Sequence, residues 1–217
     1  MEKINFSACT LYKMERTFGL VPSISISSLT TWISTTYLLN EVDIACVNRF
    51  CGTLRENVLH WNEQDLSMHF IGPMFSLTQF TVFRRFNLFA QRTISAVVQG
   101  ILLNGRTDEI IASGYREPET PYFAINEYKK ETDPNGDPAG QALAAMLVGQ
   151  QLNKEQGTDL PIYGCYVVGA LWRFMVLENS EYAISRTFDS TEIEDAYQIL
   201  RILFQLKIYC MERTEPM

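Results

Sequence analysis

The sequence predicts a mixed α/β fold of the α+β type, in which helices pack against a central mixed sheet. Three observations indicate this class. Apolar residues recur at helical spacing up to about residue 90. From residue 93 the chain carries β-rich runs separated by turn residues. A helical segment, three more β-rich runs and a last helical segment follow, so the predicted order is helices, three strands, helix, three strands, helix.

The N-terminal part is predicted to be helical. Residues 27–41 and 42–61 each have apolar residues near helical spacing and are expected to form two amphipathic helices. Asn62 is placed to cap a third helix, while Gly72 and Pro73 should kink or break it. We therefore divide the chain into two parts, an N-terminal helical extension packed on the core (residues 1–56) and a main domain (residues 57–217).

The first three strands are predicted to form an antiparallel meander. Asn104 and Gly105 are a strong hairpin signal between residues 93–103 and 106–113, because a type I′ turn requires positive φ at both central positions. A second turn at residues 114–121 leads into a third strand, "YFAINEYK".

The second half of the chain has clear boundary signals. A turn in "DPNGDPAG" precedes a helix from about 139 to 152, with Asp137 at the N-cap and Pro138 at the first helical position. A capping box of Thr191 and Glu194 is predicted to open the last helix, from about 191 to 211. Between these helices lie three predicted strands, at residues 162–170, 172–178 and 181–189.

Composition limits the classes of function. The 217 residues, 47% of them hydrophobic, are enough to bury one substantial core. A net charge of −7 argues against a general coat for nucleic acid and restricts any such contact to a local basic patch. Five scattered cysteines without a CxxC pair predict reduced core thiols. The sequence contains no long apolar run and no signal-like N-terminus, so we expect a cytoplasmic protein without a membrane span.

Two acidic residues are expected to face each other across the second and third strands. A register that pairs 113 with 122 also pairs Asp108 with Glu127. On that register Asp108, Ile110 and Ala112 share a face with Phe123, Ile125 and Glu127. Like charges directly across a strand pair repel, so a cation between them would explain the arrangement. Hard oxygen ligands favour Mg²⁺, or Mn²⁺ in its place.

These residues resemble the signature of the PD-(D/E)XK nuclease superfamily, the restriction-endonuclease-like fold. Asp108 is followed, after eighteen intervening residues, by the triplet Glu127-Tyr128-Lys129. The predicted order also matches that family's αβββαβ core over roughly residues 57 to 170, with the later strands and helix as an extension. Thr107 stands where the motif's name has proline.

The resemblance implies a role for each site residue. Asp108 and Glu127 would hold the catalytic metal, Lys129 would orient or activate the attacking water, and the Tyr128 carbonyl would add a ligand. Glu63 would match the glutamate of the preceding helix, with Asp65 or Glu56 as substitutes. Gln141 would match a glutamine found early in the following helix.

Each of these positions also suits an ordinary structural role. Glu127 and Lys129 fit a solvated strand end, and Asp108 follows a tight turn where Asp is common. Acids in the first helical turn, such as Glu63, complement the helix dipole. Glu117 and Glu119 are alternatives to Asp108 as the metal acid.

The function implied is metal-dependent hydrolysis of phosphodiester bonds in nucleic acid, with a DNA endonuclease expected; DNA and RNA are not distinguished. A local basic patch is predicted to contact the phosphates, and it consists of Arg84, Arg85, Arg92 and Lys130. Dimerisation through the N-terminal helices is a further expectation, since proteins of this fold often pair. The alternative is a catalytically inactive nuclease-like fold that binds nucleic acid or protein.

Overall fold

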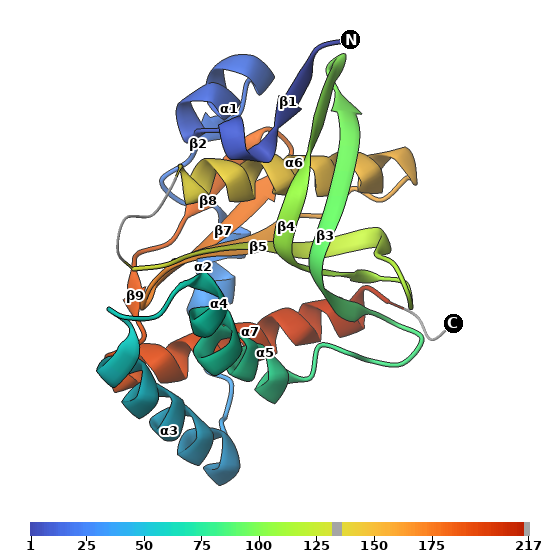
Figure 1. The fold of residues 1–217 in the computed structure, drawn as a ribbon. Coiled ribbons are helices and arrows are strands. Elements are labelled where there is room, and N and C mark those ends of the chain that lie inside the picture. Colours follow the sequence, from blue (N-terminus) through green and yellow to red (C-terminus); the bar gives the residue numbers. More distant parts are fainter. Residues whose placement is uncertain (132–135, 215–217) are drawn as a thin grey trace.

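A mixed nine-stranded sheet lies at the centre of the computed structural model, with helices on both of its faces (Figure 1). The structure describes residues 1–131 and 136–214. The mixed α/β class predicted from the sequence is confirmed. Within the described residues, no helix combines the length and the apolar character needed to cross a membrane.

The sheet contains both parallel and antiparallel neighbours. Its main path runs β1-β4-β5-β6-β7-β8-β2, with β3 paired to β4 and β9 paired to β7. The β5–β6, β1–β4 and β2–β8 pairs are parallel, and the others are antiparallel. The strands are β1 (Lys3–Asn5), β2 (Val21–Pro22), β3 (Asn87–Val98), β4 (Ile101–Ser113), β5 (Glu119–Lys129), β6 (Ile162–Val168), β7 (Leu171–Glu178), β8 (Glu181–Ile184) and β9 (Phe188–Asp189).

Two long helices cover opposite faces of the sheet. In Figure 1, α6 crosses one face and α7 crosses the other. The helices are η1 (Phe6–Ala8), α1 (Leu11–Phe18), α2 (Ser27–Ile33), α3 (Glu41–Asn57), α4 (Glu63–Leu66), a π-helical turn η2 (Ser67–Ile71), α5 (Gly72–Thr78), α6 (Pro138–Glu155) and α7 (Ile193–Glu212).

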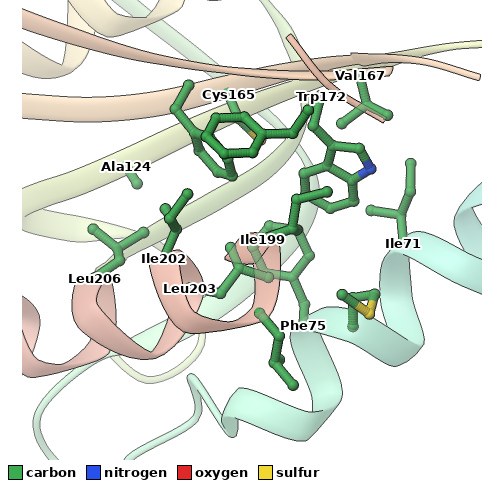
Figure 2. Packing of buried hydrophobic residues seen from close by; sticks show 14 of the residues in the cluster. Ile71, Phe75, Ala124, Cys165, Val167, Trp172, Ile199, Ile202, Leu203 and Leu206 are labelled. Atoms are coloured by element: carbon green, nitrogen blue, oxygen red, sulfur yellow. The ribbon is translucent and has the colours of Figure 1, made fainter. Parts of the chain in front are cut away.

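Each face of the sheet has its own apolar core. The α7 face packs against α2, α3 and α5 around Trp172, which is fully buried between Ile71, Phe75 and Ile199 (Figure 2). The α6 face is formed with α1 and includes Met146. The aromatic residues that alternate along β6 and β7 are all buried and pack in these cores: Tyr163, Tyr166, Trp172 and Phe174.

The predicted meander is confirmed, but its first turn was misplaced. β3 pairs with β4 through Gln99 and Gly100, whose φ angles of 51° and 84° are the positive values a two-residue hairpin needs. Asn104 and Gly105 lie inside β4 instead. A Cβ at Gly105 would stand 2.4 Å from the Phe6 ring, so this glycine admits the N-terminal segment against the sheet.

Two helix predictions were wrong in detail. The single helix expected over residues 27–41 ends at Ile33, and Asn40 then caps α3 by accepting a hydrogen bond from the Asp43 amide. Thr191 does not cap the last helix; its amide and hydroxyl donate to Asp189 instead. The helix at Pro138 does begin with Asp137 as its N-cap, as predicted. Residues 133–135 of the turn before it lie outside the described residues.

The N-terminal segment contributes strands as well as helices. β1 and β2 lie at opposite ends of the main path of the sheet, each in a parallel pair. Residues 1–56 are therefore joined to the main sheet by backbone hydrogen bonds in addition to the expected helix packing. The division of the chain at residue 56 stays a prediction.

Candidate active site

The site is formed where β4 and β5 diverge. The ladder pairs Ile111 with Ala124 and Glu109 with Asn126, on the register predicted from the sequence. Beyond the bulge at Ala112 the predicted pairing of 113 with 122 is wrong, because Ser113 pairs with Glu119.

The bulge also corrects the predicted shared face. Ile110, Ala112 and Ile125 lie together in the core on the α6 side, but Phe123 belongs to the core on the α7 side. An extra residue in one strand exchanges the two faces, so a prediction that continued the alternation past residue 124 failed there.

Asp108 replaces a ladder hydrogen bond with a side-chain one. The regular pairing ends at Glu109, and the Tyr128 amide donates to Asp108 Oδ2 at 2.7 Å. Gln91 on β3 donates to Asp108 Oδ1 at 2.8 Å. The carboxylate of Asp108 thus bridges β3 and β5 at the point where Glu127 and Lys129 leave the core.

Glu127, Lys129 and Glu63 form the rest of the cluster. Lys129 Nζ donates to Glu127 Oε1 at 2.7 Å and lies 3.8 Å from Glu63 Oε2. The side chains of Glu127 and Lys129 are only 11% and 14% exposed, so this ion pair lies in a largely desolvated position. The side chain of Glu63, on α4, is 47% exposed and lies at the rim of the cluster.

The electrostatics of the cluster follow from burial and from like charges. Burial, and then the charge of Asp108, raise the pKa of Glu127 from 4.5 to about 7. Burial also raises the pKa of Glu63, which Lys129 lowers and Asp108 raises further. Burial lowers the pKa of Lys129, but the hydrogen bond and charge of Glu127 outweigh it and the net direction is upward. The charge of Glu63 also raises the pKa of Glu127, and Lys129 lies beside both carboxylates.

The structure distinguishes between the alternative acids. Asp65 accepts a hydrogen bond from the Asn62 amide in a capping box, so it serves the start of α4. Glu56 is exposed on α3. Glu117 lies 3.3 Å from Arg92, and Glu119 stands opposite Ser113 in the β4–β5 ladder. Of the candidate acids on α3 and α4, Glu63 is the one that lies beside Lys129.

Gln141 is not joined to this cluster by any hydrogen bond of the described residues. It is 8% exposed in the first turn of α6, and its amide lies close to Gly136, where a Cβ would stand 2.4 Å from Nε2. Its predicted catalytic role stays a prediction.

The predicted basic residues have different partners in the structure. Arg85 donates from Nε to the Thr214 hydroxyl and from Nη2 to the Met211 and Thr214 carbonyls, so its donors serve the end of α7. Arg84 is exposed and stacks on Phe83. Lys130 is near enough to lower the pKa of Glu63, although burial raises it overall. Arg84 is therefore exposed and Lys130 half-buried, whereas the side-chain donors of Arg85 hold the end of α7.

A buried partner of the site was missed in the sequence. Glu109 follows Asp108 on β4, is 6% exposed, and accepts a hydrogen bond from the Tyr128 hydroxyl at 2.5 Å. Burial raises its pKa from 4.5 to about 7, and the charge of Asp108 adds to the rise. Its place directly before Ile110 and Ile111, in the apolar part of β4, was the available signal for a buried acid.

The donor set suits Mg²⁺ or Mn²⁺ better than a softer metal. In residues 1–131 and 136–214, no three side chains of His, Cys, Asp or Glu gather closely enough to hold a metal by themselves. Mg²⁺ commonly binds one or two carboxylates and keeps several waters, so Asp108 and Glu127 are compatible with it. The five cysteines are free, and four of them are buried, as expected of core thiols.

A groove lies elsewhere on the molecule. It has a volume of about 1040 Å³ between α3, α5 and α7 and is lined in part by Tyr37, Asp43, Phe204 and Lys207. The candidate acids are not among its lining residues.

Comparison with known proteins adds little to this geometry. No protein-family model and no curated protein matches the chain. Among solved structures, a chain of the cryo-EM structure of a DrdV–DNA complex is similar, with 16% sequence identity and a TM-score of 0.43. The match covers 74% of this chain but 14% of that chain, and at this TM-score it carries no argument about fold or function.

Proposed function

We propose that the protein hydrolyses phosphodiester bonds of nucleic acid, with DNA as the substrate class, in a reaction that depends on Mg²⁺ or Mn²⁺. One observation carries the proposal. Asp108 leaves the β4–β5 ladder, and its charge is coupled to Glu127 in a desolvated cluster that also contains Lys129. The element order from α4 through β3, β4, β5 and α6 to the parallel strand β6 is also the αβββαβ order of the PD-(D/E)XK family that the sequence resembles.

Four groups of the chain are assigned to the metal. Asp108 and Glu127 would be its carboxylate ligands, with the Tyr128 carbonyl and Glu63 as further oxygen donors. When bound, the ion would lower the pKa of a water and neutralise charge on the phosphate. The excess of carboxylates over ammonium groups in the cluster favours a divalent cation there.

The protein groups have separate tasks in this proposal. Lys129, largely buried and paired with Glu127, would orient the attacking water. A pKa of about 7 lets Glu127 exchange a proton near neutral pH once the cluster is metal-free. Lys130 and the exposed Arg84 would contact substrate phosphates, and Arg92 would do so after releasing Glu117.

A second candidate function is a binding module without catalysis. The observation in its favour is that the carboxylate oxygens of the cluster already have partners in the protein. Asp108 accepts two hydrogen bonds, and Glu127 is paired with Lys129. A metal would have to displace Lys129 from Glu127, or bind the remaining lone pairs.

Calorimetry and cleavage on the same samples test the proposal. We expect Mn²⁺ binding and Mn²⁺-dependent nicking of plasmid DNA by the wild type. Asp108→Asn and Glu127→Gln should lower cleavage by more than about 100-fold, since even outer partners of metal ligands cost roughly 10- to 100-fold. Glu181→Gln, an exposed acid at the start of β8, is the control and should behave as wild type.

The outcomes separate the two functions. Equal Mn²⁺ binding by wild type and both site variants would contradict the metal site. DNA binding in a gel-shift assay without cleavage under any divalent ion would favour the binding module.

A further inference from the structure

Gln91 has an unusual backbone conformation for a residue in mid-strand. Its φ is +55°, a left-handed value that residues other than glycine adopt rarely and at an energetic cost. It lies in β3 directly opposite Asp108: Ala90 pairs with Glu109 and Arg92 with Thr107, and the pair between them is missing from the ladder. The strain is therefore located at the candidate metal ligand.

At the same point, the alternation of side chains between the two faces of the sheet is interrupted in both β3 and β4. In β3, Ile94 near the hairpin turn and Phe89 near the start of the strand both face the core on the α6 side. In β4, Leu103 near the turn and Ile110 farther along the strand face the same core. In each strand these two residues are an odd number of positions apart, whereas uninterrupted alternation requires an even number. The hairpin thus exchanges its faces at Gln91 and Asp108, which frees the Asp108 side chain from its place in the alternation.

The Gln91 side chain holds one oxygen of the Asp108 carboxylate. Its Nε2 donates to Asp108 Oδ1 at 2.8 Å while the Tyr128 amide donates to Oδ2 at 2.7 Å. One donor on each oxygen fixes the plane of the carboxylate relative to Glu127. Without the side-chain amide of Gln91, only the hydrogen bond from the Tyr128 amide to Oδ2 would restrain rotation of the Asp108 carboxylate.

We propose that Gln91 is a positioning residue of the active site, which orients the Asp108 carboxylate for the metal. The inference rests on the proposed function and deepens it. Gln99 provides the comparison within the same hairpin, because it also has a positive φ, of 51°, and donates from its side-chain amide, to the Phe18 carbonyl at 3.1 Å. Gln99, however, lies in the hairpin turn, where positive φ is expected.

The decisive variant is Gln91→Gly, which keeps the left-handed backbone accessible and removes the whole side chain, including the amide that donates to Asp108. We expect kcat for Mn²⁺-dependent cleavage to fall about 10- to 100-fold, the usual cost of losing an outer partner of a metal ligand, with KM for DNA little changed. Gln99→Gly should cleave like the wild type. Gln91→Asn, which tolerates left-handed backbone but has a shorter reach, should restore part of the activity.

A measurement without metal keeps this inference separate from the proposed function. Amide hydrogen exchange of Tyr128, followed by NMR in EDTA, should become about fivefold faster in Gln91→Gly, because a loosened Asp108 protects that amide less. Gln99→Gly should leave it unchanged. If the wild type neither binds Mn²⁺ nor cleaves, the proposed function fails, and Tyr128 exchange alone decides whether Gln91 orients Asp108. Equal Tyr128 exchange and equal kcat in the two glycine variants would overturn the inference.

Discussion

Glu109 offers a direct test of the electrostatics beneath the candidate site. Its carboxyl group is buried on β4, accepts the Tyr128 hydroxyl, and has a pKa raised to about 7 mainly by burial. The substitution Glu109→Gln keeps the shape and an oxygen acceptor for Tyr128 but removes the ionisation. We expect it to stabilise the protein at alkaline pH and to leave stability unchanged in acid.

The magnitude follows from linkage between proton binding and folding. A pKa raised from 4.5 to about 7 corresponds to roughly 3 kcal/mol, at about 1.4 kcal/mol for each pH unit. The folded state binds more protons than the unfolded state between these values, so stability is full below pH 4.5 and is lost as the pH rises through about 7. Wild type should therefore be up to about 3 kcal/mol less stable than Glu109→Gln near pH 8. Glu127 contributes a loss of the same sign to both proteins, so it largely cancels in the comparison.

Urea unfolding followed by far-UV circular dichroism measures this difference. Both proteins would be titrated in EDTA from about pH 4.5 to about pH 8, with linear extrapolation to water at each pH. Glu56→Gln, at an exposed position on α3, is the control for replacing a carboxylate by an amide at the surface. A constant difference between wild type and Glu109→Gln across this range would refute the reasoning, since it would mean that Glu109 does not titrate differently in the folded state.

Two predictions concern contacts that join distant parts of the chain. Asn153, fully buried near the end of α6, accepts from the Tyr122 amide and donates to the Tyr122 carbonyl; Asn153→Ala should cost about 1–3 kcal/mol for each backbone group left without a partner, and a total loss in urea below about 0.5 kcal/mol would contradict this. Gly105→Ala should destabilise by about 1–3 kcal/mol because its Cβ would meet the Phe6 ring, whereas Gly52→Ala, with open space on α3, should be neutral or stabilise by up to about 1 kcal/mol. Thermal unfolding of the two glycine variants side by side checks their opposite signs.

Local patterns were sufficient for the order of the elements and for one feature of the site. Turn residues, cap residues and the spacing of apolar residues predicted the antiparallel meander, the helix at Pro138 and the final helix, because these signals are properties of single segments. The pairing register placed Asp108 level with Glu127, and the observed Glu109–Asn126 pair lies on that register. The predicted pairing of Asp108 with Glu127 falls just beyond that pair, where the described ladder ends.

Long-range packing decided what the local patterns left ambiguous. The turn forms at Gln99-Gly100, whereas Asn104-Gly105 lies inside β4, where Phe6 from the other end of the chain fills the space over Gly105. Arg85 was assigned to a basic patch, but its partners are backbone groups of α7 and a threonine beyond it. The roles of Gln91 and Glu109 depend on a left-handed backbone in mid-strand and on burial beneath Tyr128. A sequence specifies which side chains carry charge and which segments alternate, whereas the desolvation and the partner of each charge arise only when elements far apart in the chain exclude water together.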